Sequence, residues 1–227
     1  MGSLVFNYYD GRDITDAMLE AAAKLFNNNY GIWDERLGRK GRVKLSARRL
    51  RENYLPQGAT TVYASVTSDG ALVGNVFACR WRCGDKSVCW VTQLVVARGF
   101  RERGLASSLL RLMRQDTDSI YGIMSSHPAA ILASAKAFGR TFAPLDLDFM
   151  RTQAAAVMVE SPISYVKDAK LSGSLFLDDT SGLVAGVDTR FFLDHTEPSE
   201  ALERRRKHGW PLGVLPAGHE FILVLQV

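Results

Sequence analysis

The chain has 227 residues, of which 47% are hydrophobic and 23% are charged. This length and composition suit one globular α/β domain with a modest extension, and they exclude a disordered or low-complexity protein. The formal net charge of +4 comes mainly from basic clusters in residues 36–51, 98–114 and 204–207, which suit a polyanionic small molecule as well as nucleic acid.

The cysteines, at positions 79, 83 and 89, are odd in number and lie close together in the sequence. Because their number is odd and they lie close together, we do not expect a disulfide framework. Because no cluster of histidines accompanies them, we do not expect a metal site. The N-terminus lacks a secretory apolar region, and the longest apolar run, residues 154–159, is too short to span a bilayer. We therefore expect a cytoplasmic protein, with the nucleus as the alternative.

The first half of the chain predicts a strand, two helices and then three strands, at about residues 4–9, 14–29, 45–54, 60–67, 71–81 and 87–96. Asp13 is expected to cap the first helix, and Gly31 lies just past its end. A charged, glycine-punctuated loop at residues 34–43 precedes the second helix. The three strands are separated by short turns and predict an antiparallel meander.

The second half predicts helices at about residues 105–113, 128–139, 148–159, 165–171 and 199–207, and strands at about residues 120–125, 184–193 and 220–226. Pro128 fits the first position of its helix. This order places a strand-to-helix turn in the middle of the chain, near residue 100. A ligand phosphate can meet a helix N-terminus at such a turn.

That turn carries the most specific motif in the sequence. Residues 94–106 read Leu-Val-Val-Ala-Arg-Gly-Phe-Arg-Glu-Arg-Gly-Leu-Ala, so a turn rich in Arg and Gly joins an apolar strand to a helix. Unpaired N–H groups at a helix start converge on one spot, which suits a pyrophosphate. Gly104 would let the backbone approach the phosphates closely. The segment resembles the acetyl-CoA motif of the GNAT (Gcn5-related N-acetyltransferase) superfamily, Arg/Gln-x-x-Gly-x-Gly/Ala after a Leu-x-Val strand end, with Ala106 in the last position.

The resemblance covers approximately residues 4–142 and implies an α/β fold of the GNAT type. This fold has a mixed, mostly antiparallel sheet flanked by helices, and a splayed strand pair in it binds acetyl-CoA. We expect a single domain over residues 1–227, in which residues 143–227 elaborate the core and complete the sheet.

The resemblance also implies which residues contact acetyl-CoA: Leu94, Val95, Val96, Arg101, Glu102, Arg103, Gly104, Leu105, Ala106, Ser107, Ser125 and Ser126. For the two serines the alternative is a turn into a helix that Ser126 or His127 caps.

The usual acid of the family is missing. Many GNAT enzymes place a tyrosine on the helix after the splayed strand, where it protonates the departing thiolate, and this chain has Ala135 there. Ser134 is the candidate replacement, with a packed helical serine as the alternative.

The general base is also not evident on the central strand, whose polar side chains Thr92 and Gln93 can position a substrate but not accept a proton. His195, at the end of a predicted strand, is the candidate base, with a surface network as the alternative. Because adjacent positions on a strand point to opposite faces, Glu197 is a better candidate than Asp194 to orient its ring.

Substrate contacts are expected from Thr92, Gln93 and the segment after the first helix, with Asn29, Tyr30 and Trp33. The predicted activity is acetyl transfer from acetyl-CoA to an amine, that of a small molecule, by direct attack in a ternary complex. We expect a monomer or homodimer without a specific nucleic-acid or membrane partner. The alternatives are an O-acetyltransferase, a protein N-acetyltransferase, a non-catalytic acyl-CoA-binding or sensing module, and a basic nucleic-acid-binding protein.

Overall fold

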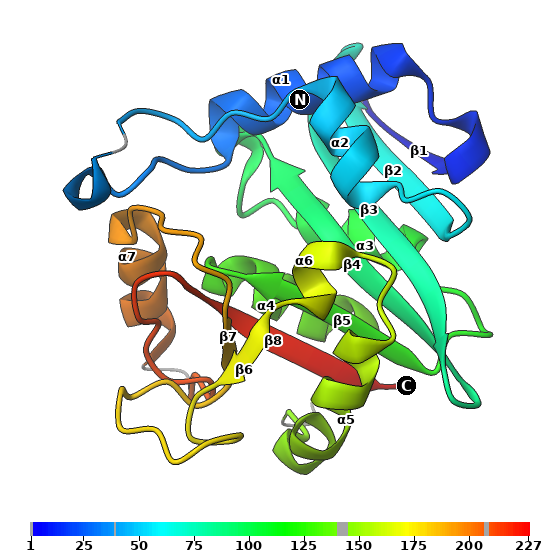
Figure 1. The fold of residues 1–227 in the computed structure, drawn as a ribbon. Coiled ribbons are helices and arrows are strands. Elements are labelled where there is room, and N and C mark those ends of the chain that lie inside the picture. Colours follow the sequence, from blue (N-terminus) through cyan, green and yellow to red (C-terminus); the bar gives the residue numbers. More distant parts are fainter. Residues whose placement is uncertain (1, 39, 140–144, 207–208) are drawn as a thin grey trace.

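The computed structural model describes residues 2–38, 40–139, 145–206 and 209–227. Its frame is an eight-stranded sheet with the strand order β1-β2-β3-β4-β5-β8-β7-β6 (Figure 1). The strands are β1 Leu4–Asp10, β2 Thr60–Ser68, β3 Ala71–Cys83, β4 Lys86–Val96, β5 Ile120–Ser125, β6 Lys170–Ser172, β7 Gly186–Asp188 and β8 His219–Gln226. Each neighbouring pair is antiparallel except β4 with β5, which is parallel.

Helices cover both faces of this sheet (Figure 1). They are α1 Asp16–Asn29, α2 Ala47–Tyr54, α3 Leu105–Leu112, α4 Pro128–Phe138, α5 Leu147–Val159, α6 Ser164–Lys167 and α7 Thr196–Arg206. Side chains alternate along β2, so Tyr63 packs with α1 and α2 while Val62 and Ala64 pack with α3. The predicted fold class is confirmed, including the antiparallel meander of β2, β3 and β4.

The strands β4 and β5 part halfway along their length. They pair from Val88 with Ile120 to Val91 with Ile123, whereas β4 continues to Val96. On the other side of β4, the register with β3 shifts between Val91 and Gln93, which leaves Thr92 as the extra residue of a β-bulge. The two strands are therefore splayed, as the resemblance implied, and the bulge lies at the position where they separate.

Close packing holds β5 against β4 below this point. A Cβ added at Gly122 would lie 2.1 Å from the Trp90 ring, so only glycine fits there. At the start of β5, the buried Asp118 accepts hydrogen bonds from Arg80 Nε at 2.9 Å and from the Tyr121 hydroxyl at 2.9 Å. These contacts fix the position of the strand that forms one side of the opening.

Four predictions at element ends are corrected. Thr15, not Asp13, caps α1, because its hydroxyl accepts a hydrogen bond from Met18 N at 3.2 Å while Asp13 ends a short 3-10 helix. The helix predicted at residues 165–171 is only the single turn α6, and Lys170–Ser172 instead pairs with β7 as an edge strand.

The strand predicted at residues 184–193 is limited to Gly186–Asp188, because Arg190 adopts a left-handed conformation with φ of +52°. The helix predicted from residue 199 begins at Thr196, where the Asp194 carboxylate accepts a hydrogen bond from Thr196 N at 2.8 Å. His195 therefore stands at the start of a helix and not at the end of a strand.

Candidate functional site

The turn between β4 and α3 presents a run of free backbone donors. No backbone hydrogen bond to an acceptor among the described residues involves the N–H groups of residues 104–107. Glu102 and Gly104 both have positive φ, +62° and +79°, which curves the backbone so that successive N–H groups converge. No heavy atom lies within 4 Å of the place where a Cβ of Gly104 would stand. The turn therefore leaves space for an anion at the N-terminus of α3.

The side chain of Arg101 supports this turn from within. Arg101 Nε donates to Val96 O at 3.2 Å, and its NH2 group donates to Asn29 O at 2.6 Å. The Asn29 amide oxygen accepts from Arg98 N at 3.0 Å. Asn29, predicted as a substrate contact, thus ties the end of α1 to the turn. The backbone N–H of Arg101 donates to Arg98 O at 3.3 Å, so both this group and the guanidinium have partners within the chain, and the phosphate contact predicted for Arg101 stays a prediction.

An acidic residue on α7 completes the network around the turn. The Glu197 carboxylate pairs with Arg101 and, at 3.1 Å, with Arg98. It also lies 3.9 Å from His127 Nε2. Glu197 was expected to orient His195, but the recorded partners of its carboxylate are these three side chains.

The end of β4 directs backbone groups into the opening beside β5. Ala97 N donates to Val73 O of β3 at 2.8 Å. Because the direction of backbone groups alternates along a strand, those of Leu94 and Val96 point away from β3. Val95 is buried between them, against the cluster of α1 and the segment after it. The contact with the pantetheine arm predicted for Leu94 and Val96 stays a prediction.

On the other side of the opening, the two serines at the end of β5 lead into a helix. Ser125 Oγ accepts from His127 N at 3.1 Å, and His127 Nδ1 accepts from Ala129 N at 3.1 Å. His127 is therefore the cap of α4, as the alternative interpretation of these residues expected. Ser126 is buried and lines a cavity of about 20 Å³ together with His195 and Phe221.

Ser134 lies on the packed face of α4. Its side chain is 1% exposed, and its hydroxyl has no hydrogen-bond partner in the described chain. Ile131 and Phe138, which are three and four positions away, belong to the main core, where Phe138 stacks on Tyr121. The catalytic role predicted for Ser134 stays a prediction.

His195 is half-buried, and within the described residues its Nε2 has no partner. Burial lowers its pKa, against the opposing charges of Asp194 and Asp34. An open hollow beside it is lined by Asp34, Arg36, Asp194, Thr196 and Ser199. A neutral imidazole in this position can accept a proton, so the role predicted for His195 also stays a prediction.

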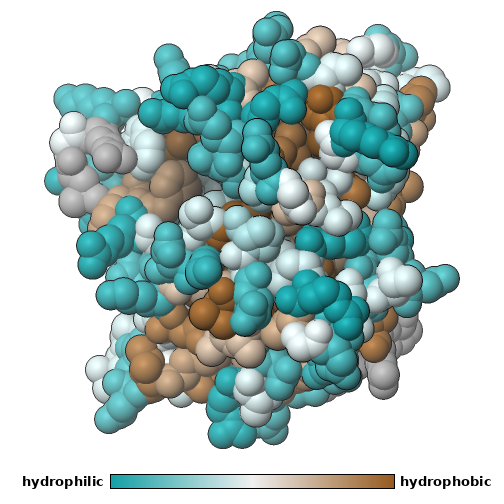
Figure 2. Space-filling model, turned by 45° about the vertical axis from the view of Figure 1, so that its right-hand side comes forward, coloured by the Kyte–Doolittle hydropathy of each residue, from teal (hydrophilic) through white to brown (hydrophobic). Residues whose placement is uncertain are grey.

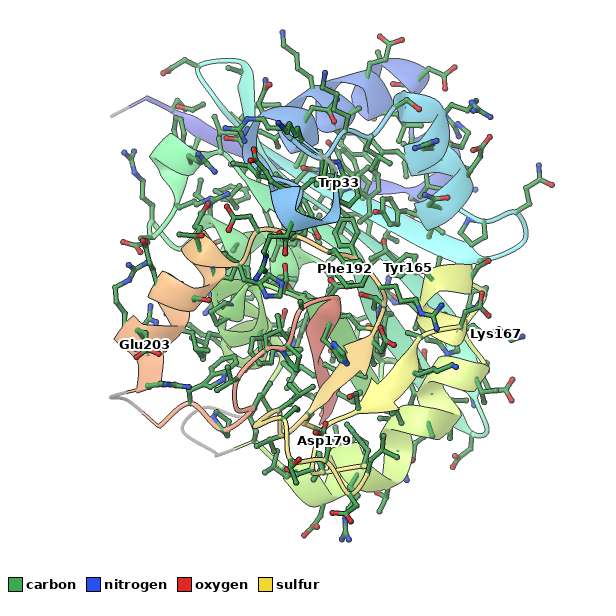
Figure 3. All side chains as sticks on the ribbon, turned by 60° about the vertical axis from the view of Figure 1, so that its left-hand side comes forward. Trp33, Tyr165, Lys167, Asp179, Phe192 and Glu203 are labelled. Carbon is green, nitrogen blue, oxygen red and sulfur yellow. The ribbon has the colours of Figure 1, made fainter. Side chains whose placement is uncertain are left out.

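Sequence reasoning missed a group of tyrosines that meets the sheet at the bulge. The Tyr165 hydroxyl of α6 donates to Thr92 O at 2.8 Å, and the Tyr165 ring makes an edge contact with Tyr54 at 5.7 Å. Figure 3 shows Tyr165, Phe192 and Trp33 along the boundary between the segments of α1 and α2 and those of β6 and β7. Trp33 contacts Phe191 at 5.3 Å, edge to face.

A buried carboxylate at the start of β8 was also missed. Glu220 is 8% exposed, and burial raises its pKa to about 7, against a hydrogen bond with Thr189 that lowers it. Its charge contributes to the raised pKa values of Tyr30, Tyr54 and Tyr165, so these three side chains lie near it. The signal for Glu220 was present, since it is a single acidic residue at the head of an apolar strand.

The polar side chains of the central strands are incompletely satisfied here. Gln93 Oε1 lies 3.5 Å from Asn75 Nδ2, but Gln93 Nε2, Asn75 Oδ1 and Thr92 Oγ1 are buried and have no partner in the part of the chain that the structure describes. Buried polar atoms normally have partners, so these atoms indicate a place where water or a ligand group binds.

Comparisons with known proteins give structural likeness only. No known family model matches the chain. No curated protein matches it either. Among solved structures, the ribosomal-protein-S18-alanine N-acetyltransferase of Escherichia coli is similar, with 13% identity over 63% of this chain and 86% of that chain and a TM-score of 0.40. The GNAT family N-acetyltransferase YhbS of Escherichia coli, solved in complex with CoA, has 16% identity over 59% of this chain and 68% of that chain, with a TM-score of 0.41.

NAA60 of Arabidopsis thaliana, solved in complex with a bisubstrate analogue, has 15% identity over 58% of this chain and 80% of that chain, with a TM-score of 0.41. The similar structures thus include proteins of the superfamily that the sequence resembles. At these identities and scores they establish no activity for this chain, so the function has to be argued from its own residues.

Other kinds of site find little support in the described residues. They contain no group of three or more His, Cys, Asp or Glu side chains able to hold a metal ion. None of the helices within them is long and apolar enough to cross a membrane. The exposed large apolar side chains are scattered, and the face in Figure 2 is mostly hydrophilic with separate apolar patches.

Proposed function

We propose that the chain is an acetyl-CoA-dependent acyltransferase that acetylates the amine of a small molecule. The observation that carries this proposal is the run of free N–H groups at residues 104–107, next to the opening between β4 and β5. A pyrophosphate needs several convergent donors, and a pantetheine arm needs an unpaired strand edge beside them. Both features are present in adjacent positions.

In this proposal, the turn from Arg101 to Ser107 holds the pyrophosphate through its backbone. The edge of β4 at Leu94 and Val96 holds the pantetheine arm, and a backbone N–H of that edge donates a hydrogen bond to the thioester oxygen, which stabilises its developing negative charge. Acetyl-CoA supplies the activated acyl group. Residues at the opposite side of the opening bind and orient the acceptor, which makes the attack effectively intramolecular.

His195 and Ser134 remain the candidates from sequence for the base and the acid. The acceptor side is assigned to Tyr30, Trp33, Thr92 and Gln93, with Asn29 behind them as a support. A small-molecule acceptor, a monomer or homodimer, and a cytoplasmic or nuclear location belong to the same proposal. O-acetylation and protein N-acetylation are the competing acceptor classes.

A thermal-shift titration with acetyl-CoA tests the binding half of the proposal. Acetyl-CoA should raise the melting temperature of the wild type, because a ligand that binds only the folded state stabilises it. Gly104→Val should abolish that shift, because it places a side chain in the open space of the turn. Gly58→Val is the matched control, since Gly58 has the same φ of +79° and equally open surroundings. A Gly104→Val variant that keeps the full shift would place the phosphates elsewhere.

The competing function is a non-catalytic acyl-CoA sensor. The observation that favours it is Ala135 at the position where the family commonly has its acid. A sensor would show the acetyl-CoA shift without releasing thiol in the presence of any amine.

A further inference from the structure

Glu220 differs from the other buried carboxylates of the described chain. Asp34 pairs with Arg36 at 2.6 Å, and Asp118 pairs with Arg80 at 2.9 Å. Glu220 is equally buried, yet it forms no salt bridge with a described residue. A buried carboxylate without a salt-bridge partner destabilises a fold, so its presence indicates a functional role and not a stabilising one.

The surroundings of Glu220 are hydroxyl-rich and aromatic. Thr189 supplies a hydrogen bond, and Tyr30, Tyr54 and Tyr165 are the titratable groups that its charge affects. All three tyrosine residues are partly exposed, whereas Glu220 is buried. Such a site suits an ammonium group, which can pair with the carboxylate and contact ring faces.

The same tyrosines connect Glu220 to the place where the thioester would lie. Tyr165 donates to the carbonyl of Thr92, the bulge residue at which β4 and β5 separate. Gln93, the next residue along β4, lies close enough to Tyr54 to lower its pKa, although burial raises the pKa of Tyr54 overall. On β8, Phe221 pairs with Ser125 at the end of β5, so Glu220 lies at the open end of the splayed pair.

We propose that Glu220 is the catalytic base of the acyl transfer, and that it binds the acceptor as a primary ammonium ion. This inference rests on the proposed function. Glu220 takes one proton from R–NH3⁺, and the nitrogen lone pair of R–NH2 then forms a C–N bond with the thioester carbon. The C–S bond breaks with its electron pair leaving on sulfur, and the second nitrogen proton passes to the thiolate. The products are R–NH–CO–CH3 and the free thiol, with one proton on Glu220 that returns to solvent.

The ionisation of Glu220 fits this role. Burial raises its pKa to about 7, which suits a group that accepts a proton near neutral pH and releases it again. Tyr165 is a positioning residue, because its hydroxyl holds the bulge carbonyl rather than a reacting atom.

His195 lies on a different side of β8. It shares a cavity with Phe221, and Phe221 and Glu220 are consecutive on the strand, so their side chains point to opposite faces. The two candidates for the base are therefore spatially distinct, and substitutions can separate them.

The test compares wild type, Glu220→Gln and Glu203→Gln in the full chain. Glu203 is a matched control, because it is an exposed glutamate on α7 that pairs only with Arg206 among described residues. Each protein receives acetyl-CoA with phenethylamine, tyramine or hexylamine, and thiol release is followed between pH 5 and 9. Acetyl-CoA binding is measured separately by thermal shift.

The expected result is turnover of at least one of the three amines by wild type and Glu203→Gln, and a loss of roughly a hundredfold in Glu220→Gln. The acetyl-CoA shift should be unchanged in all three proteins. The wild-type rate should rise with pH up to about 7, and this limb should be absent from Glu220→Gln. Tyr165→Phe should slow turnover, but its rate should still rise with pH up to about 7, because the Tyr165 hydroxyl does not accept the proton.

Three other outcomes would each contradict a specific part of the proposal. If acetyl-CoA binds and Glu220→Gln keeps wild-type turnover, Glu220 is not the base although the proposed function stands. If acetyl-CoA binds and none of the three amines reacts with wild type, the assignment of an ammonium site is wrong. If acetyl-CoA does not bind wild type, the proposed function itself fails.

Discussion

The guanidinium of Arg101 and the carboxylate of Glu197 form an ion pair that joins the turn after β4 to the first turn of α7. Arg98 shares the same carboxylate. The turn that is proposed to hold a pyrophosphate therefore has a negative side chain next to it, tied to two of its arginines. The negative charge of this carboxylate repels a phosphate group bound at the turn.

Glu197→Gln should accordingly bind acetyl-CoA a few-fold more tightly at low ionic strength. The substitution removes a negative charge near the phosphates, and the effect should shrink in high salt because the charges are partly exposed. The stability loss should stay within about 1 kcal/mol, as for other surface ion pairs. Isothermal titration calorimetry measures the affinity. Weaker binding would show instead that the ion pair holds the turn in its competent shape.

Glu220→Gln should stabilise the fold at high pH while it removes activity. The pKa of Glu220 is raised from 4.5 to about 7, so the folded state favours the neutral form and loses stability as the pH rises from about 4.5 through 7. The full cost of ionisation at pH 8 is on the order of 3 kcal/mol. Melting curves should show a gain of several degrees for Glu220→Gln at pH 8 and almost none at pH 5. An equal difference in melting temperature between Glu220→Gln and wild type at both pH values would mean that folding does not raise the pKa of Glu220.

His195→Gln should bind acetyl-CoA normally and turn over an amine within about threefold of the wild-type rate, if Glu220 is the base. The measurement is kcat for the amine that wild type uses fastest. A loss of roughly a hundredfold, the usual size for a lost general base, would return that role to His195. Glu220→Gln would then have to remain active.

Gly122→Ala should destabilise the protein by about 1 to 3 kcal/mol, the typical cost of overpacking. The new methyl group would lie 2.1 Å from the Trp90 ring, and the two strands must separate to make room for it. Urea unfolding measures the loss. Gly99→Ala serves as the control, because Gly99 lacks a positive φ and no heavy atom lies within 4 Å of its Cβ position, so a smaller loss is expected there. Equal stability of Gly122→Ala and wild type would mean that β4 and β5 do not need this close packing.

Much of the fold could be predicted because the periodic signals in residues 4–139 are strong. The antiparallel meander and the turn at Gly104 both follow from local patterns of apolar residues, glycines and arginines. The tyrosine cluster could not be predicted in this way. Tyr165 meets Thr92 across 73 residues of sequence, and it does so from a helix of one turn that local propensity does not specify. The partners of Glu197 were missed for the same reason, since Arg101 lies 96 residues away.

The most direct test of the central claim is mass spectrometry of the products formed by the purified chain with acetyl-CoA and a mixture of primary amines. The account predicts an amine that gains one acetyl group and an equal amount of free CoA, and neither product with Gly104→Val. A wild-type protein that is stabilised by acetyl-CoA but acetylates no amine would contradict the claim of catalysis. A wild-type protein that acetyl-CoA does not stabilise, and that forms no product, would contradict the proposed function entirely.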